Sequence, residues 1–199
     1  YLRKKHDRKK DKLVLFGTGT SGEPQGATVV ATTFPTGTGM AGSIPGDVNI
    51  MQVINSAITA IFTRHNYTDE GNYMANNVRM NPVDFFTNFV AAVDGEGRPL
   101  YPMASLFNVV VIGGVTIVPD EDIPAGKILV ADLSKYNVLN YVPYTVKIGW
   151  VNEDFIKNQF VILAESRFHA FVKNLDRLAF IYDDISAIKT NLKSGTPSA

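Results

Sequence analysis

Apolar residues recur at helical spacing in two parts of the chain, and each part carries a helix-start signal. From Asp47 to Arg64 they recur at steps of three and four residues, which predicts a helix with Asp47 as its N-cap. Asn81-Pro82 predicts a second helix reaching Val93, because Asn caps helices well and Pro suits the first helical position. The residues expected to face the core are Val48, Met51, Ile54, Ile58, Ile61 and Phe62 in the first helix, and Phe85, Phe86, Phe89 and Val90 in the second.

Shorter apolar segments with turn residues at their ends predict strands in the middle of the chain. Two of these segments are separated only by Gly113-Gly114, which indicates a tight turn between them. The expected strands are Tyr73–Met80, Phe107–Ile112, Val115–Val118 and Lys127–Ala131, and the other expected turns are Asp69–Asn72, Asp94-Gly95 and Asp122–Gly126.

The longest alternation of apolar and polar residues predicts a β-hairpin. In its first strand, Tyr144–Val151, the apolar face carries Val146, Ile148 and Trp150. A polar connection follows, and alternation then resumes from Phe160 to Val172. The connection contains Asn152, Glu153 and Asp154, and the second strand places Phe160, Ile162, Ala164, Phe168, Ala170 and Val172 opposite Glu165, Arg167, His169 and Lys173.

Two other segments have little helical or strand character. Gly17–Gly46 is rich in Gly, Thr and Ser and contains three prolines, so it predicts a long connection interrupted at most by a short strand around Ala27–Thr33. Asn191–Ala199 has the composition of a flexible tail.

Composition is that of a folded protein, with 45% hydrophobic and 19% charged residues among 199. The formal net charge is zero, but Leu2–Lys12 contains seven Lys and Arg residues against two Asp residues. Such a run usually forms a solvated helix face; the functional alternative is contact with packaged DNA or an acidic neighbour. The absence of cysteine excludes disulfides, thiolate metal sites and a cysteine nucleophile. No apolar run approaches the roughly 20 residues of a membrane span.

The loop Gly17–Gly22 matches the Gly-x-Gly-x-x-Gly spacing of dinucleotide-binding loops and follows an apolar run. Such a loop must open a helix that faces the pyrophosphate, and an acidic residue about 20 positions later must hold the ribose. Here Glu23–Gly26 is a poor helix start, and Gly37–Gly42 contains no acid. We therefore expect no cofactor, and a nucleotide-binding enzyme using this loop remains the alternative from a different class.

Other candidate chemistry is weak. The histidines His6, His65 and His169 have no recognisable nucleophile partner in the sequence, although triads can be assembled from any chain order. The carboxylate clusters Asp120–Asp122 and Asp183-Asp184 lack the spacing of a known calcium loop and are interpreted as solvated turns. No catalytic residue and no metal ligand are expected.

Four local motifs, in order, resemble the major capsid proteins of tailed phages, the Hong Kong 97 family. The first is Leu13–Gly17 with Gly19 and Pro24–Gly26, similar to a stretch that follows the family's long spine helix. The second is a strand ending at Asn81-Pro82 before a helix, with Asp94–Pro102 after it. The third is Val109–Val111, the strand to Val118 and then Ile123–Asp132, where Ala131 stands at a position that is usually glycine; the fourth is Phe155 and Asn158–Phe168 with Ala179-Phe180.

The resemblance implies structural roles for ten motif positions rather than catalytic ones. It also implies an α+β fold with an axial lobe, at the centre of pentamers and hexamers, and a peripheral lobe with a long hairpin. The motif positions are Gly17, Gly19, Gly26, Asn81, Pro82, Pro124, Gly126, Asp132, Arg167 and Phe180. The implied ranges are 1–26 for the end of the spine helix and its connection, 27–143 for the axial domain, 144–174 for the hairpin, 175–190 for the return to the axial domain and 191–199 for the tail.

On this resemblance the protein is a structural subunit that self-assembles into an icosahedral shell in the virion. Its expected partners are copies of itself, packaged DNA, and scaffold, protease or portal proteins, with assembly in the host cytoplasm and no membrane. Because the chain opens at Tyr1 within a charged helix, we expect an upstream arm and extended loop, without which the fragment is monomeric or weakly associated. An encapsulin-type compartment protein is the alternative with the same fold.

Overall fold

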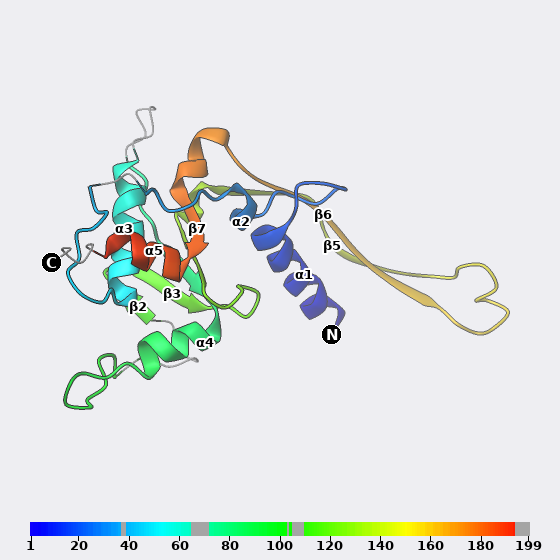
Figure 1. Ribbon diagram of the computed structural model, residues 1–199. Coiled ribbons are helices and arrows are strands. Elements are labelled where there is room, and N and C mark those ends of the chain that lie inside the picture. Colours follow the sequence, from blue (N-terminus) through cyan, green and yellow to red (C-terminus); the bar gives the residue numbers. More distant parts are fainter. Residues whose placement is uncertain (37–38, 65–71, 103, 105–109, 194–199) are drawn as a thin grey trace. The chain divides into compact units, whose positions relative to one another are not determined.

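The computed structural model describes residues 1–36, 39–64, 72–102, 104 and 110–193, and the chain forms two compact units (Figure 1). Each unit is assembled from two separate stretches of sequence. Unit 1 consists of Tyr1–Val29 and Tyr136–Val172, and unit 2 consists of Val30–Lys135 and Lys173–Ala199.

Unit 2 contains a five-stranded sheet in the order β2-β3-β1-β4-β7. β1 pairs in parallel with β3 and antiparallel with β4, and every other neighbouring pair is antiparallel. The strands are β1 (Asn77–Met80), β2 (Val110–Ile112), β3 (Val115–Pro119), β4 (Lys127–Ala131) and β7 (Phe180–Asp184). In the interior strand β4 four consecutive residues are buried, as expected of a strand covered on both faces.

The strand predictions hold in the middle of the chain and fail at some ends. β4 has the predicted bounds, and β2 and β3 are joined by Gly113-Gly114, both at positive φ as a tight turn requires. β1 begins at Asn77 rather than Tyr73, because Tyr73 is a buried loop residue whose hydroxyl donates to the Leu175 carbonyl at 2.9 Å. The expected residues 69–71 and 107–109 lie outside the described part of the chain.

Helices α3 (Ile50–Thr63) and α5 (Ile185–Leu192) contact each other and the sheet. The N-cap of α3 is Asn49 and not Asp47: Asn49 and Gln52 form a reciprocal capping box with two bonds of 2.9 Å. Asp47 instead pairs with Lys193 at 2.9 Å. α5 extends to Leu192, which is buried, so the segment whose composition predicts a tail begins inside a helix; residues 194–199 lie outside the described part.

The core face of α3 is only partly the predicted one. Ile54 and Ile61 are buried, whereas Phe62 is 48% exposed. The buried face is shifted away from the predicted stripe of large apolar residues and includes small residues. Small side chains allow the helix to pack closely against its neighbours on that face. The buried positions are Ile50, Val53, Ile54, Ser56, Ala57, Ala60 and Ile61, while Met51 and Ile58 are half-buried.

The second predicted helix begins as expected and ends early. Asn81 caps α4 (Pro82–Phe85) with Pro82 in the first turn, and the helix continues as the π-helical segment η1 (Phe86–Val90) rather than reaching Val93. Phe85 and Phe89 are fully buried, but Phe86 is 51% exposed, which corrects its assignment to the core face.

The Asn81 side chain makes two hydrogen bonds, one that caps α4 and one to the turn before β4, so its substitution tests both contacts. Its Oδ1 accepts from the Val83 amide at 2.9 Å and its Nδ2 donates to the Ile123 carbonyl at 2.8 Å. We expect Asn81→Ala to lower the free energy of unfolding by about 2 kcal/mol, because a cap and a half-buried hydrogen bond are both lost. Urea unfolding should show a smaller loss for Asn81→Asp, which keeps the cap but loses the donor; equal losses would contradict the dual role.

Unit 1 contains helix α1 (Leu2–Phe16), the single-turn helix α2 (Ala27–Val30) and the long antiparallel ribbon of β5 (Tyr136–Gly149) and β6 (Val161–Val172) (Figure 1). α2 replaces the strand expected at Ala27–Thr33, where Thr32 forms only an isolated bridge. β5 begins eight residues before the predicted Tyr144. The prediction missed this first part because apolar and polar residues do not alternate there, and the ladder shifts register between Asn140 and Thr145. Short 3-10 turns, η2 (Leu133–Lys135) and η3 (Asn174–Ala179), flank the ribbon in sequence.

Candidate assembly surface

The half of the β5–β6 ribbon next to its connecting loop exposes an apolar face. The ladder pairs Ile148 with Ile162 and Val146 with Ala164, so these side chains share one face, as the alternation predicts. Ile148 is nevertheless 70% exposed and Val146 51%. An apolar face of an antiparallel pair normally packs on a core, and a two-stranded hairpin alone is marginally stable in water. This face therefore has the character of a surface that another element covers.

The loop at the end of the ribbon adds aromatic side chains to this surface. Phe155 and Ile156 are 75% and 84% exposed, and the Trp150 and Phe155 rings meet edge to face with centroids 5.9 Å apart. Backbone bonds, such as Gln159 N to Asp154 O at 2.8 Å, give the loop a defined shape. We call the apolar residues of this face and of the loop the ribbon surface: Val146, Ile148, Trp150, Val151, Phe155, Ile156, Phe160 and Ile162, each more than 40% exposed.

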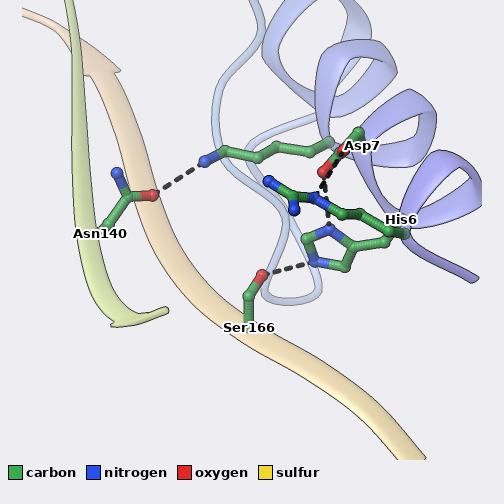
Figure 2. A network of polar contacts seen from close by, with 6 residues as sticks. His6, Asp7, Asn140 and Ser166 are labelled. Atoms are coloured by element: carbon green, nitrogen blue, oxygen red, sulfur yellow. Dashed lines mark hydrogen bonds and ion pairs between the residues drawn. The ribbon is translucent and has the colours of Figure 1, made fainter. Parts of the chain in front are cut away.

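The opposite half of the ribbon is held against α1 by polar contacts. Figure 2 shows His6 on α1 pointing at Ser166 on β6, with Nε2 and Oγ 2.6 Å apart. Lys10, one helical turn further, donates to Asn140 Oδ1 on β5 at 2.8 Å, and its Nζ lies 4.9 Å from the Phe168 ring centroid. The His6 ring also meets the Tyr144 ring edge to face at 4.9 Å. Because these contacts come from positions i and i+4, they fix which face of α1 meets the ribbon.

Ser166, His6 and Asp7 are connected in the same order as the residues of a catalytic triad, which raises the question of whether they could act as one (Figure 2). The Asp7 bond to His6 Nδ1 is 3.4 Å long, and the Asp7 side chain is 57% exposed. A triad aspartate is buried and aligned to hold one imidazole tautomer, and in α/β-hydrolases the serine lies on a strained turn between a strand and a helix. Ser166 instead lies within β6. We interpret the contact as one that orients α1.

A second polar contact lies across the ribbon. Lys147 Nζ and Glu165 Oε1 are 2.6 Å apart on neighbouring strands. The hydrogen bond and charge of Lys147 lower the pKa of Glu165, with a smaller contribution from the charge of Arg167. The charges flanking the ribbon surface are thus balanced across the two strands, and Glu165 pairs with Lys147 rather than with its same-strand neighbour Arg167.

Three motif glycines lie where the chain leaves α1. Gly26 N donates to Gly17 O at 2.8 Å, so the two backbones nearly touch. A Cβ at Gly17 would lie 2.2 Å from the Pro24 carbonyl oxygen, and one at Gly26 would lie 2.5 Å from the Gly17 nitrogen. Gly19, at φ +74, allows the turn between these crossings. The loop folds back on itself through a Thr18 bridge to Gln25 and opens no long helix, so it lacks the geometry that a pyrophosphate loop needs.

Four motif positions meet around one corner of unit 2. Asn81-Pro82 and the turn Pro124–Gly126 are joined by the bond from Asn81 to Ile123, described above, and by a bond of 2.6 Å from Gly126 N to Asp84 Oδ2. Gly126 O also accepts from Ile185 N at 2.8 Å. The corner links β1, α4, β4 and α5 through two bonds between a side chain and the backbone and one bond between backbone groups.

The remaining motif positions lie elsewhere. Asp132 is buried and accepts from Met74 N, from Asn76 Nδ2 and from Ser134, whose Oγ lies 2.6 Å away. Phe180 is fully buried, and its carbonyl accepts from Thr32 N at 3.0 Å. Arg167 is exposed on β6. The ten positions therefore do not converge on one pocket: three lie in the connection after α1, four lie at the corner of unit 2, and Arg167 lies on the surface.

The contacts that orient α1 were missed from sequence. His6 and Ser166 are 160 positions apart, and Lys10 and Asn140 are 130 apart, so no local pattern relates them. The carboxylates singled out as clusters are engaged separately: Asp120 pairs with Arg79 at 2.7 Å and Asp184 with Lys127 at 2.9 Å. Across the described ranges, no three His, Asp or Glu side chains gather as metal ligands.

The fold of this chain is similar to that of known phage capsid proteins. The mixed fold is that of capsid proteins: the structure superposes on the capsid of an empty GTA particle (TM-score 0.62, 18% identity, 91% of this chain and 62% of that one). It also superposes on chains of Gordonia phage Cozz (0.57, 14%, 89% and 58%) and Mycobacterium phage Bobi (0.52, 21%, 83% and 54%). The model of the phage capsid family matches residues 1–181, and the chain belongs to that family.

The matches also mark the extent of the likeness. The chain spans about 62% of the length of the GTA capsid chain. A search of curated protein sequences finds no match.

Proposed function

We propose that the protein is a major capsid subunit of a tailed phage or prophage that assembles with copies of itself into an icosahedral shell. Its role is structural rather than catalytic. Membership of the phage capsid family supports the role, and the exposed ribbon surface is the observation that carries the assembly mechanism. Burying apolar side chains between copies supplies the main free energy of such association.

The ribbon surface is large enough for this role. An interfacial aromatic side chain buries about 150–250 Å². Trp150, Phe155 and Phe160 together with their aliphatic neighbours therefore approach the roughly 800 Å² that each partner contributes to a stable interface. The Lys147–Glu165 pair beside this surface would set register between copies more than affinity.

The two units correspond in this proposal to the two lobes of a capsid subunit. Unit 2 would be the axial lobe at the centre of pentamers and hexamers, and unit 1 the peripheral lobe with its ribbon. The ten motif positions would hold the local geometry of these lobes. In the virion the partners would be neighbouring subunits and packaged DNA, with scaffold, protease or portal proteins during assembly in the host cytoplasm.

One finding bears on the encapsulin alternative and another on the membrane. The matching family is one of phage capsids, which favours a phage shell over an encapsulin-type compartment. Within the described residues no helix is long and apolar enough to span a bilayer.

Sedimentation velocity of this chain at rising concentration tests the proposal. We expect weak self-association that Trp150→Ser with Ile156→Ser weakens by roughly 30-fold or more, because truncating an interface anchor costs about 2 kcal/mol or more. Met74→Ser with Val83→Ser removes apolar side chains that are 70% and 66% exposed in unit 2 and serves as the matched control. Equal association of the two double variants would refute the ribbon surface as the interface.

Electron microscopy of the complete gene product then tests the shell itself. Closed particles are expected from the unaltered sequence and open or absent particles from the ribbon variant. A uniformly monomeric gene product would overturn the capsid role.

A further inference from the structure

A groove of about 350 Å³ lies in unit 1 between α1 and β6, beside the contacts that hold the helix on the ribbon (Figure 2). Leu13 of α1 and Ala164 and Phe168 of β6 line it with apolar side chains, and each of the three is half-buried. An apolar cavity of about 150 Å³ is large enough to hold benzene. The groove therefore has room for a large apolar side chain from a partner.

The groove begins where the ribbon surface ends. Ala164 pairs with Val146 of the ribbon surface, and Ser166 lies on the same face because side chains alternate along a strand. His6 of α1 covers this face at Ser166. The open apolar surface and the groove are thus neighbours on one face of the ribbon, so a partner that covers the ribbon surface also lies next to the groove.

The charged side chains that line the groove give it an excess of positive charge. Lys9 and Lys10 line it together with Glu165, the one acidic residue among the described lining residues. Glu165 is bound by Lys147 at 2.6 Å, and Lys10 donates to Asn140 at 2.8 Å. With Lys147 included, three lysines stand against one glutamate, so the groove favours a carboxylate beside the apolar side chain that enters it.

The loop at the end of the ribbon carries both kinds of group. Phe155 and Ile156, the two most exposed side chains of the ribbon surface, directly follow Glu153 and Asp154. Bonds to the Glu153 carbonyl from the amides of Ile156 and Lys157, at 3.0 and 3.1 Å, close a turn. Glu153 and Lys157 also form an ion pair at 3.0 Å, but both side chains are more than 60% exposed, and such a pair contributes little.

The loop and the groove lie at different places along the ribbon of one copy. Ser166 and Val161 are five positions apart on β6, which is about 17 Å along an extended strand. The ladder with β5 keeps the strand extended as far as Val161, and the loop lies beyond that residue. The loop of one copy therefore meets the groove of a different copy.

We propose that the ribbon loop of a second copy of this chain inserts Phe155 and Ile156 into the groove between α1 and β6. Glu153 of the same loop then lies beside the lysines of the groove. The apolar side chains supply the affinity as interface anchors, and the charges set the orientation. The inference rests on the proposed function, because it names the surface of the neighbouring subunit that the ribbon surface meets.

Disulfide trapping tests the contact, because the chain contains no cysteine of its own. A chain with Lys9→Cys is mixed with a size-tagged chain carrying Ile156→Cys and oxidised; both positions are exposed. The mixed disulfide is the expected main product, since a disulfide forms where the Cα atoms come within about 7 Å. In the control Met74→Cys, at a position 70% exposed in unit 2, replaces Ile156→Cys and should give background product. Equal product in both mixtures, or none in the first, would overturn the inference.

Sedimentation velocity of charge-reversal variants tests the orientation. Lys9→Glu and Glu153→Lys should each weaken self-association by about fivefold, because an attraction between exposed charges becomes a repulsion. An equimolar mixture of the two variants should associate more tightly than either alone, since the reversed loop of one copy then meets the reversed groove of the other. A mixture no tighter than its components would contradict the contact.

The ribbon variant separates this inference from the proposed function. Self-association that falls with Trp150→Ser and Ile156→Ser but does not respond to Lys9→Glu or Glu153→Lys would overturn the groove as the partner surface. The proposed function would stand in that case, because the ribbon surface would still be the interface.

Discussion

Replacing Phe89 by alanine is expected to lower the free energy of unfolding of unit 2 by about 3–5 kcal/mol, the usual cost of truncating a buried phenylalanine. Phe89 is fully buried in η1; its ring stacks on Phe85 at 5.2 Å and lies 5.3 Å from the Tyr101 ring. Alanine would remove these contacts and leave a cavity that the surrounding chain fills only in part. Urea unfolding, with hydrogen exchange of unit 2 peptides, measures the loss.

Phe86 provides the matched control in the same π-helical segment. Its side chain is 51% exposed, so Phe86→Ala should change the free energy of unfolding by less than about 1 kcal/mol. A loss for Phe86→Ala as large as that for Phe89→Ala would contradict the orientation of the segment. The comparison also tests the departure from an α-helical apolar face, on which both residues were expected to lie.

The second large effect is expected at Gly26 in unit 1. Gly26→Ala would place a methyl group 2.5 Å from the Gly17 nitrogen and 2.6 Å from the Leu15 carbonyl oxygen. Both neighbours are backbone atoms, so the crossing of the two segments must open, and we expect a loss of about 1–3 kcal/mol. Since Leu15 lies in the last turn of α1, the protection of α1 amides from hydrogen exchange should fall most.

Gly149→Ala is the control within the same unit. A Cβ at Gly149 meets nothing within 4 Å, and its backbone needs no positive φ. Alanine there should leave the free energy of unfolding within about 0.5 kcal/mol. If Gly26→Ala were equally harmless, the close approach of the connection to itself would not be needed for the fold.

Local signals in the sequence predicted local structure well. The cap Asn81, its following Pro82 and the paired glycines Gly113-Gly114 each act within a few residues, and the structure confirms all of them. The hairpin was found because alternation over its second strand reports a repeated environment, and the ladder confirms that Ile148 and Ile162 share a face. Its start was missed, because near Asn140 the register shifts and the alternation is lost.

The candidate site was predictable in part. The apolar residues of the ribbon surface and the basic run of α1 are visible in the sequence. Whether Ile148 is buried or exposed is not, because alternation records which side chains share a face and not what covers it. The same limit applies to Phe62 and Phe86, which have apolar side chains at helical spacing and lie at the surface.

The sequence by itself determined the cap at Asn81, the turn at Gly113-Gly114, the strand β4 and the mixed class of fold, because these depend on backbone preferences and short-range hydrogen bonds. Only the tertiary structure decided that His6 meets Ser166, that Gly26 crosses Gly17, and which faces of α1 and the ribbon remain outside. Contacts between distant segments depend on how whole elements pack, and no short pattern encodes that packing.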